Sequence, residues 1–151
     1  MSKILVVEDD ESVRRLVTRV LDLGGYESEE ASSGAEALEK LAAQHYELVV
    51  LDLMLGPVSG WNVLEEMNRK GIRSNTRVIM LTARTSERDF MNGWRLGVDQ
   101  YLTKPFDPSA LTEAVEDTLR QSPEQLAERR KAELQKAELL YRLESAFDQP
   151  S

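Results

Sequence analysis

The chain has 151 residues, of which 41% are hydrophobic and 30% are charged, and its formal net charge is −8 at pH 7. This composition is typical of a soluble globular domain, and it excludes cysteine chemistry and histidine-rich metal sites because cysteine is absent and His45 is the single histidine. The acidic balance argues against direct nucleic-acid binding, and no apolar run approaches the roughly 20 residues that cross a bilayer, so we expect a cytoplasmic chain without signal peptide or membrane span.

Short apolar runs alternate with helical patterns over the first 120 residues. In chain order we first predict a strand at 4–7, a helix carrying Val13 to Leu21, an edge strand at 26–30, a helix from Ser33 and a strand at 48–51. We then predict a helix from Ser59 or Gly60, a strand at 78–81, a helix carrying Phe90 and Trp94, a strand at 99–103 and a helix from Asp107. The runs are continuously apolar, which is typical of parallel strands covered on both faces. The alternation predicts an α/β domain with a parallel sheet and right-handed crossovers.

A long helix is predicted after the fifth helix of this domain. Ser122 and Pro123 form a typical helix start, and Pro123 disfavours helical dihedrals at the residue before it. The predicted helix runs from Pro123 to about Phe147 with no strand after it. We therefore expect a domain over 1–121 and a helical C-terminal extension over 122–151.

The apolar stripe of this last helix is uneven. Arg130 and Glu133 interrupt it in the first half, and Glu138 and Arg142 are expected to pair outward in the second half. We favour packing of the second half against a second copy of the chain or another helix, and the alternative is a solvated helix that frays. The second half places five apolar residues within a broad stripe, namely Leu134, Ala137, Leu140, Tyr141 and Phe147.

Polar side chains follow the apolar runs at their carboxyl ends. These residues are Glu8 and Asp9 after the first strand, Asp52 after the third, Thr82 after the fourth and Lys104 after the fifth. In an open parallel sheet the carboxyl ends of the strands face one crevice, in which ligands bind. Taken singly, each residue could be a helix cap or a solvated loop side chain. Taken together, they predict a shared site.

Three clustered carboxylates repel one another, and a pair about 4 Å apart costs about 4 kcal/mol at an effective dielectric of 20. A hard cation with oxygen ligands, Mg²⁺ or Mn²⁺, would relieve this repulsion. Such a divalent ion and Lys104 together balance the charges of Glu8, Asp9 and Asp52. This balance suits transfer of an anionic phosphoryl group to a carboxylate, with Thr82 donating its hydroxyl to a phosphoryl oxygen.

On these motifs the sequence resembles a response-regulator receiver domain of two-component signalling, from Ile4 to about Arg120. The motifs that carry the resemblance are ILVVEDD at 4–10, VLDL at 50–53, MLTA at 80–83 and YLTKPF at 101–106. The resemblance implies a flavodoxin-like, doubly wound parallel sheet of five strands in the order 2-1-3-4-5, with the long C-terminal helix added to it. It also implies that the Lys104–Pro105 peptide bond is cis.

The resemblance implies a role for each residue of the metal site. Asp52 would be the phosphoacceptor, which carries the 4-aspartylphosphate. Asp9 would hold Mg²⁺ directly and Glu8 would hold it through water. The main-chain carbonyl of Met54 would supply a further ligand.

The resemblance also implies a switch. Lys104 would pair with the phosphoryl group, Thr82 would move toward it, and Tyr101 would follow Thr82. The face formed by the fourth helix, fifth strand and fifth helix would change as a result. One departure from the family pattern is Leu55-Gly56-Pro57, where the proline stands one residue later than usual and leaves the path of this loop open.

The leading hypothesis is a signalling module that accepts a phosphoryl group from a sensor histidine kinase and signals to an unknown output protein, rather than an enzyme with a separate substrate. A homodimer through 123–148 or through the switching face is a further expectation. A small phosphatase of the haloacid-dehalogenase type is disfavoured because Asp52-Leu53-Met54 lacks the second aspartate of its D-x-D pattern. A scaffold-only receiver is disfavoured because none of the five chemical positions is substituted.

Overall fold

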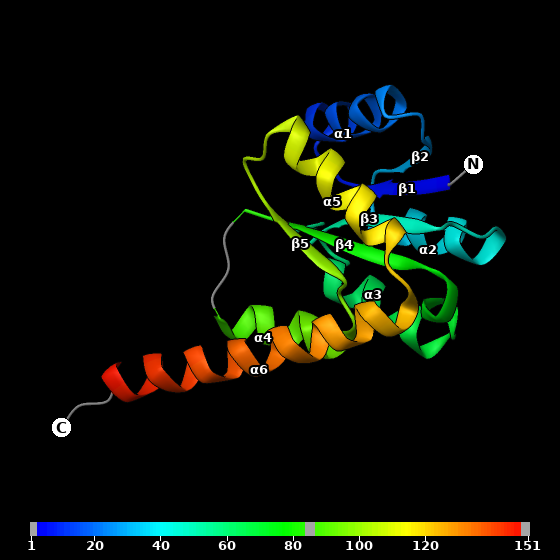
Figure 1. Ribbon diagram of the computed structural model, residues 1–151. Helices are drawn as coiled ribbons and strands as arrows, with labels where there is room; N and C mark the ends of the chain where they lie inside the picture. Colours follow the sequence, from blue (N-terminus) through cyan, green and yellow to red (C-terminus); the bar gives the residue numbers. More distant parts are fainter. Residues whose placement is uncertain (1–2, 84–86, 149–151) are drawn as a thin grey trace.

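The computed structural model describes residues 3–83 and 87–148, without the side chains of 73, 74, 87 and 148 (Figure 1). Five parallel strands form one sheet in the order β2-β1-β3-β4-β5, which confirms the predicted topology. The strands are β1 (Lys3–Val7), β2 (Glu27–Ala31), β3 (Leu48–Asp52), β4 (Arg77–Thr82) and β5 (Gln100–Thr103).

Helices cover both faces of the sheet (Figure 1). They are α1 (Glu11–Leu23), α2 (Gly34–Ala43), α3 (Gly60–Arg69), α4 (Glu87–Leu96), α5 (Pro108–Arg120) and α6 (Pro123–Asp148), with a short 3-10 helix, η1 (Ile72–Asn75), that the sequence pattern did not predict. α1 and α5 lie on one face, and α2, α3 and α4 lie on the other. None of the helices in the described ranges is both long enough and apolar enough to cross a membrane.

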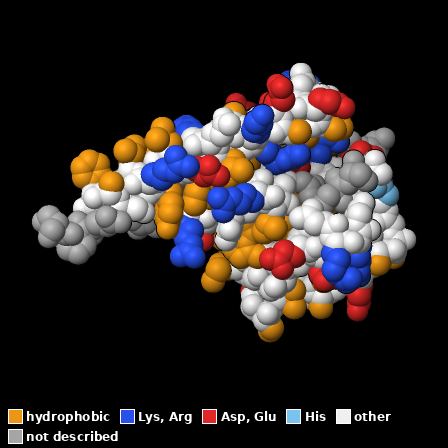
Figure 2. Space-filling view, turned by 90° about the horizontal axis from the view of Figure 1, so that it is seen from below, with side chains coloured by type: hydrophobic (Ala, Val, Ile, Leu, Met, Phe, Trp, Pro, Cys, Tyr) orange, Lys and Arg blue, Asp and Glu red, His pale blue; other side chains and the backbone are white. Residues whose placement is uncertain are grey.

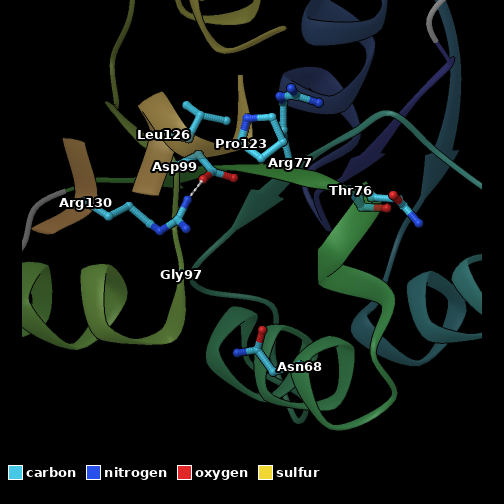
Figure 3. Close-up of a pocket in the computed structure, with 9 residues that line it drawn as sticks. Asn68, Thr76, Arg77, Gly97, Asp99, Pro123, Leu126 and Arg130 are labelled. Atoms are coloured by element: carbon cyan, nitrogen blue, oxygen red, sulfur yellow. Dashed lines mark hydrogen bonds and ion pairs between the residues drawn. The ribbon is translucent and has the colours of Figure 1, made fainter. Parts of the chain in front are cut away.

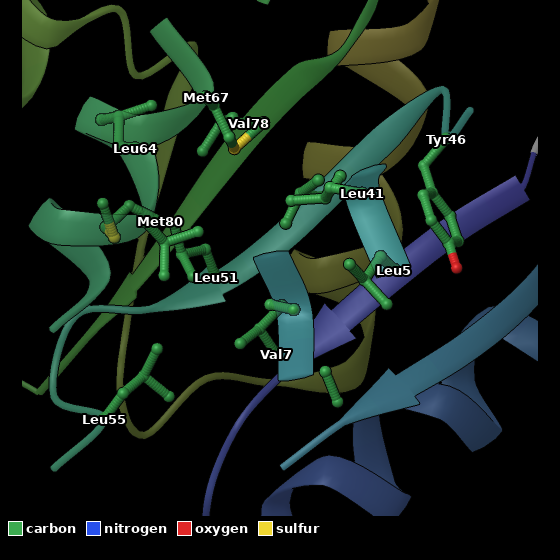
Figure 4. Close-up of a cluster of buried hydrophobic side chains, with 14 of the residues drawn as sticks. Leu5, Val7, Leu41, Tyr46, Leu51, Leu55, Leu64, Met67, Val78 and Met80 are labelled. Carbon is green, nitrogen blue, oxygen red and sulfur yellow. The ribbon is translucent and has the colours of Figure 1, made fainter. Parts of the chain in front are cut away.

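The sheet separates two hydrophobic cores because alternate strand residues point to opposite faces. Ile4 and Val6 of β1 pack toward α1 and α5, whereas Leu5 and Val7 pack toward α2 and α3 (Figure 4). β3 is buried along its whole length. With both faces of the central strands filled by apolar side chains, polar chemistry is confined to the ends of the strands.

Most helix starts lie where the sequence predicts them. Asp10 caps α1 by accepting a hydrogen bond from the main-chain N–H of Ser12 at 2.9 Å. Ser33 caps α2, and Ser59 forms a reciprocal capping box with Asn62 at the start of α3. Asp107 precedes α5 as predicted, but its side chain makes no capping hydrogen bond within the described residues.

The C-terminal helix α6 returns across the domain and packs along α4 of the same chain (Figure 1). Its direction is opposite to that of α4: Arg130, early in α6, lines a hollow with Gly97 just after α4, whereas Arg142, late in α6, lines another with Arg88 at the start of α4. The predicted outward pair of Glu138 and Arg142 is therefore wrong: Glu138 accepts a hydrogen bond from Arg95 at 3.2 Å because it faces α4. Among the described side chains of α6, Leu126 and Ala137 are buried.

The residues of α6 that are buried differ from the apolar stripe predicted from the sequence. Leu140, Tyr141 and Phe147 of the second half are exposed, and Leu134 is half-buried. The helix is instead held by its first half and its middle. Arg130, which interrupts the apolar stripe, points into the domain rather than into solvent, where it pairs with a buried carboxylate.

Candidate functional site

The register of the parallel strands brings their carboxyl ends to one edge of the sheet. Val7 lies beside Leu51, and Asp52 lies beside Leu81. The chain leaves β1 toward β2 on one side, and β3 lies on the other side. This is a topological switch point, which is where ligands bind in open α/β sheets.

Three carboxylates gather at this edge. Glu8, Asp9 and Asp52 each offer an oxygen, and these oxygens lie within 4.8 Å of one another. Glu8 is 1% exposed and Asp52 is 3% exposed, whereas Asp9 is open to solvent. Lys104 closes the cluster, with its Nζ 2.8 Å from Glu8 Oε2 and 3.3 Å from Asp52 Oδ2.

The pKa values in the cluster reflect burial first and the neighbouring charges second. Burial raises the pKa of Glu8 to about 7, and the neighbouring Asp52 adds to this rise, although hydrogen bonds from Lys104 and from the main chain of Asp10 oppose it. Burial alone would lower the pKa of Lys104, but the hydrogen bond to Glu8 and the charge of Asp52 outweigh it and raise the pKa. The lysine stays cationic, and one lysine does not neutralise three acids.

The donor set fits a hard divalent cation. It consists of carboxylate oxygens, which Mg²⁺ and Mn²⁺ prefer, and it contains neither sulfur nor imidazole. One member, Asp9, is accessible from solvent, so an ion has a route of entry. The cluster therefore has the composition and the excess negative charge that a magnesium site requires.

The loop after β3 is tied closely to Asp52. The main-chain N–H of Met54 donates to Asp52 Oδ1 at 3.2 Å, while the Met54 side chain is 72% exposed. A Cβ on Gly60 would lie 2.5 Å from the main-chain oxygen of Asp52. The start of α3 thus approaches the end of β3 as closely as only glycine allows. The loop between β3 and α3 contains Leu55-Gly56-Pro57, whose proline stands one residue later than usual in the family. In this loop Gly56 has a φ of +80° and Leu55 is buried.

Thr82 and Lys104 complete the edge of the sheet. Thr82 is the last residue of β4, is 1% exposed and lies beside Thr103 of β5. The main-chain N–H of Lys104 donates to the carbonyl oxygen of Thr82 at 2.6 Å. The Lys104–Pro105 peptide bond is cis, as the resemblance implied.

Tyr101 lies away from the carboxylates, against α4. Its ring makes edge-to-face contacts with Phe90, at 4.7 Å between centroids, and with Trp94, at 5.2 Å. Its hydroxyl donates to the carbonyl oxygen of Asp89 at 3.4 Å. Burial raises the pKa of Tyr101, and the charge of Asp89 adds to the rise. The ring is therefore packed into α4 rather than extended into solvent.

Gly93 of α4 leaves the space that the Tyr101 ring occupies, here called the Tyr101 slot, and the sequence pattern did not predict this role. A Cβ at Gly93 would lie 1.5 Å from the Tyr101 hydroxyl oxygen. A glycine in the middle of a helix loses about 1 kcal/mol relative to alanine. The low helix propensity of this glycine is the sequence signal that another group approaches the helix at this position.

Known proteins share this fold and these motifs. Residues 4–116 match the family model of the response regulator receiver domain. The chain is 40% identical over 122 residues to the transcriptional regulatory protein CpxR homolog of Haemophilus influenzae, which covers 81% of this chain and 52% of that protein. The chain spans about half the length of the curated relatives it matches.

Solved structures give the same assignment. The chemotaxis response regulator CheY4 of Vibrio cholerae superposes with a TM-score of 0.74 at 30% identity, covering 78% of this chain and 98% of CheY4. TrrA of Thermotoga maritima, solved in complex with Mg²⁺ and BeF, superposes with a TM-score of 0.70 at 35% identity and covers 78% of this chain and 99% of TrrA. The chain belongs to the family of response regulator receiver domains of two-component systems.

Proposed function

We propose that this receiver domain accepts a phosphoryl group on Asp52 from a phosphohistidine of a sensor histidine kinase. The observation that carries the proposal is the buried Asp52 carboxylate, which contacts Lys104 inside a cluster of three acids within 4.8 Å. An Asp52 oxygen would attack phosphorus, and the phosphorus–nitrogen bond would break with its electron pair going to the histidine nitrogen. Asp52 is then a phosphoacceptor, and the chain itself turns over no separate substrate.

Mg²⁺ (or Mn²⁺) would be held by Glu8, Asp9, Asp52 and the main-chain carbonyl of Met54. When bound, the ion supplies positive charge that offsets the negative charge of an incoming phosphoryl group. The Mg²⁺ and BeF complex of TrrA supports this assignment for a relative that is matched over nearly its whole length.

The protein groups have separate tasks in this proposal. The Met54 N–H and the Lys104 ammonium hold the two Asp52 oxygens, at 3.2 and 3.3 Å, and so orient the nucleophile. Lys104 then neutralises a phosphoryl oxygen, and the Thr82 hydroxyl donates to another. Movement of Thr82 would free Tyr101 to move, which would alter the face of α4, β5 and α5 that an output protein reads.

The alternatives receive less support. A haloacid-dehalogenase phosphatase is not favoured because residues 4–116 match the receiver family. A scaffold-only role is not favoured because the acid cluster and its lysine are intact. A homodimer through the α4–β5–α5 face stays a proposal, and it would require α6 to move from α4. The formal charge of −8 supports the absence of direct nucleic-acid contacts by this chain.

The test of the proposed function is phosphorylation of the purified chain by a small phosphodonor. With Mg²⁺ present, we expect one phosphoryl group per chain that is stable in acid and lost in base, as expected of an acyl phosphate. A chelator should prevent labelling. Mass spectrometry of the intact protein measures the stoichiometry. Continuous release of phosphate from a phosphate ester, without a labelled protein, would contradict the proposal.

Mg²⁺ should also raise the thermal stability. An ion that binds only the folded chain adds about 2.7 kcal/mol at 100 times its Kd. For a domain of this size, that is a rise in melting temperature of several degrees. Differential scanning fluorimetry with millimolar Mg²⁺ measures the shift, and Asp9→Asn should reduce it because one ligand charge is lost. An unchanged melting temperature at saturating Mg²⁺ would argue against the metal site.

A further inference from the structure

The start of α6 is anchored to the domain by polar contacts. Ser122 and Gln125 cap the helix reciprocally, at 2.8 and 3.1 Å. One turn later Arg129 donates to Asp117 Oδ2 at 2.6 Å and to the carbonyl oxygen of Asp99 at 2.8 Å. These contacts fix the first two turns of α6 near the entrance to β5.

A buried carboxylate strengthens this anchor. Asp99 is 2% exposed, and its Oδ2 accepts a hydrogen bond from the Val78 N–H at 2.9 Å. Arg130 reaches in from α6 to form an ion pair with the other Asp99 oxygen, and Leu126 lies beside it (Figure 3). Removing a partner from a buried ion pair is strongly unfavourable, so this end of α6 stays attached.

The remainder of α6 packs along α4 but buries few of its own side chains. After Arg130, Ala137 is the buried residue among the described side chains. The pair of Glu138 and Arg95 has side chains 33% and 54% exposed, and such surface pairs contribute little. Hydrophobic side chains gather on the projecting end of the molecule (Figure 2), and those exposed on α6 are Leu139, Leu140, Tyr141, Leu143 and Phe147.

This part of α6 lies over the Tyr101 ring, and an open hollow of about 320 Å³ lies between them. Tyr101 and Trp94 line its domain side, and Ala137 and Leu140 of α6 line the other. The walls of this hollow make no dispersion contacts across it, although Ala137 itself is buried. A protein that binds the ring of Tyr101 from the side of α6 would have to displace this part of the helix.

We propose that α6 is a hinged cover of the Tyr101 face: the segment 133–148 lifts from α4 when Asp52 is phosphorylated, while Arg129 and Arg130 keep the start of the helix attached. The inference rests on the proposed function and adds to it an internal competitor for the output protein. Because coupling between two sites is reciprocal, loosening the cover must also strengthen binding of a phosphoryl group at Asp52.

The first test uses the full chain with Mg²⁺ and beryllofluoride. Bound beryllofluoride is detected by fluorine NMR, and hydrogen–deuterium exchange is measured along α6. We expect exchange in 133–148 to rise about tenfold, since weakly packed segments open locally, and exchange in 123–130 to stay unchanged. A bound fluorine signal with unchanged exchange would overturn the hinged cover alone. Absence of a bound signal would overturn the proposed function and the inference that rests on it.

The second test loosens the cover without touching the site. Glu138→Lys places a positive charge beside Arg88, Arg95 and Arg142, with which Glu138 lines one hollow of the surface. Glu128→Lys makes the same change at an exposed position of α6 and is the matched control. The first variant should bind beryllofluoride about three- to fivefold more tightly than the control, and the difference should shrink in high salt. Equal affinities would overturn the proposal.

Discussion

Asp52→Asn is expected to abolish the base-labile phosphoryl group completely while leaving the domain folded. The carboxamide has nearly the same shape as the carboxylate, so the buried end of β3 keeps its packing, but its neutral oxygen is a poor nucleophile. The substitution also removes one of three negative charges that lie within 4.8 Å. The melting temperature without Mg²⁺ should therefore be equal to or higher than that of the wild type.

Asp10→Asn is the matched control for this prediction. Asp10 follows the acidic pair at the end of β1, but its carboxylate caps α1 by accepting from Ser12 and Val13 at 2.9 and 3.2 Å. Asparagine caps helices as well as aspartate does. Asp10→Asn should thus be labelled like the wild type. Labelling of Asp52→Asn to the wild-type level would show that the acceptor is another residue.

Gly93→Ala is expected to expel the Tyr101 ring from its slot in α4. The new Cβ would lie 1.5 Å from the hydroxyl oxygen and 2.6 Å from Cζ of the ring. The ring would lose its burial and two edge-to-face contacts, each contributing about 0.5–1.5 kcal/mol. This loss exceeds the gain of about 1 kcal/mol in helix propensity. We expect a net destabilisation of about 1–2 kcal/mol in chemical denaturation, with altered Trp94 fluorescence.

A double-mutant cycle identifies the cause of that loss. In a Tyr101→Ala background the clash is absent, so Gly93→Ala should become stabilising by up to about 1 kcal/mol. Asn92→Ala, at the exposed neighbouring position of α4, should give the same small effect with or without Tyr101. Equal effects of Gly93→Ala in both backgrounds would mean that Tyr101 does not occupy the slot.

The fold and the acid cluster could be predicted because they follow from burial. Runs such as Leu48 to Leu51 are apolar at every position, which requires a strand covered on both faces. In such a sheet, polar residues are tolerated at the strand ends, so Glu8, Asp52 and Lys104 had to meet at one edge. The three side chains do meet there, with Lys104 in contact with both acids.

The docking of α6 could not be predicted in the same way. Apolar periodicity locates a contact only where apolar side chains make it, and α6 is anchored by Arg129 and Arg130. Arg130 interrupts the predicted apolar stripe of α6. The buried Asp99 that it pairs with lies 31 residues earlier in the chain, so the periodicity of α6 alone does not indicate this contact. The role of Gly93 could not be predicted for a related reason. Its role depends on Tyr101, which reaches it only once β5 and α4 have packed together.

The position of Arg129 also bears on how the sheet avoids aggregation. β5 is an edge strand, and edge strands offer unpaired main-chain groups to other chains. It has only four residues, and Arg129 occupies the carbonyl oxygen of Asp99 at its entrance. The opposite edge, β2, carries Glu27, Glu29 and Glu30, of which the last two form ion pairs with Lys3 and Arg14, so charged side chains line this edge. Neither edge is a good template for intermolecular strand pairing, which protects the domain from edge-to-edge association even while its C-terminal helix moves.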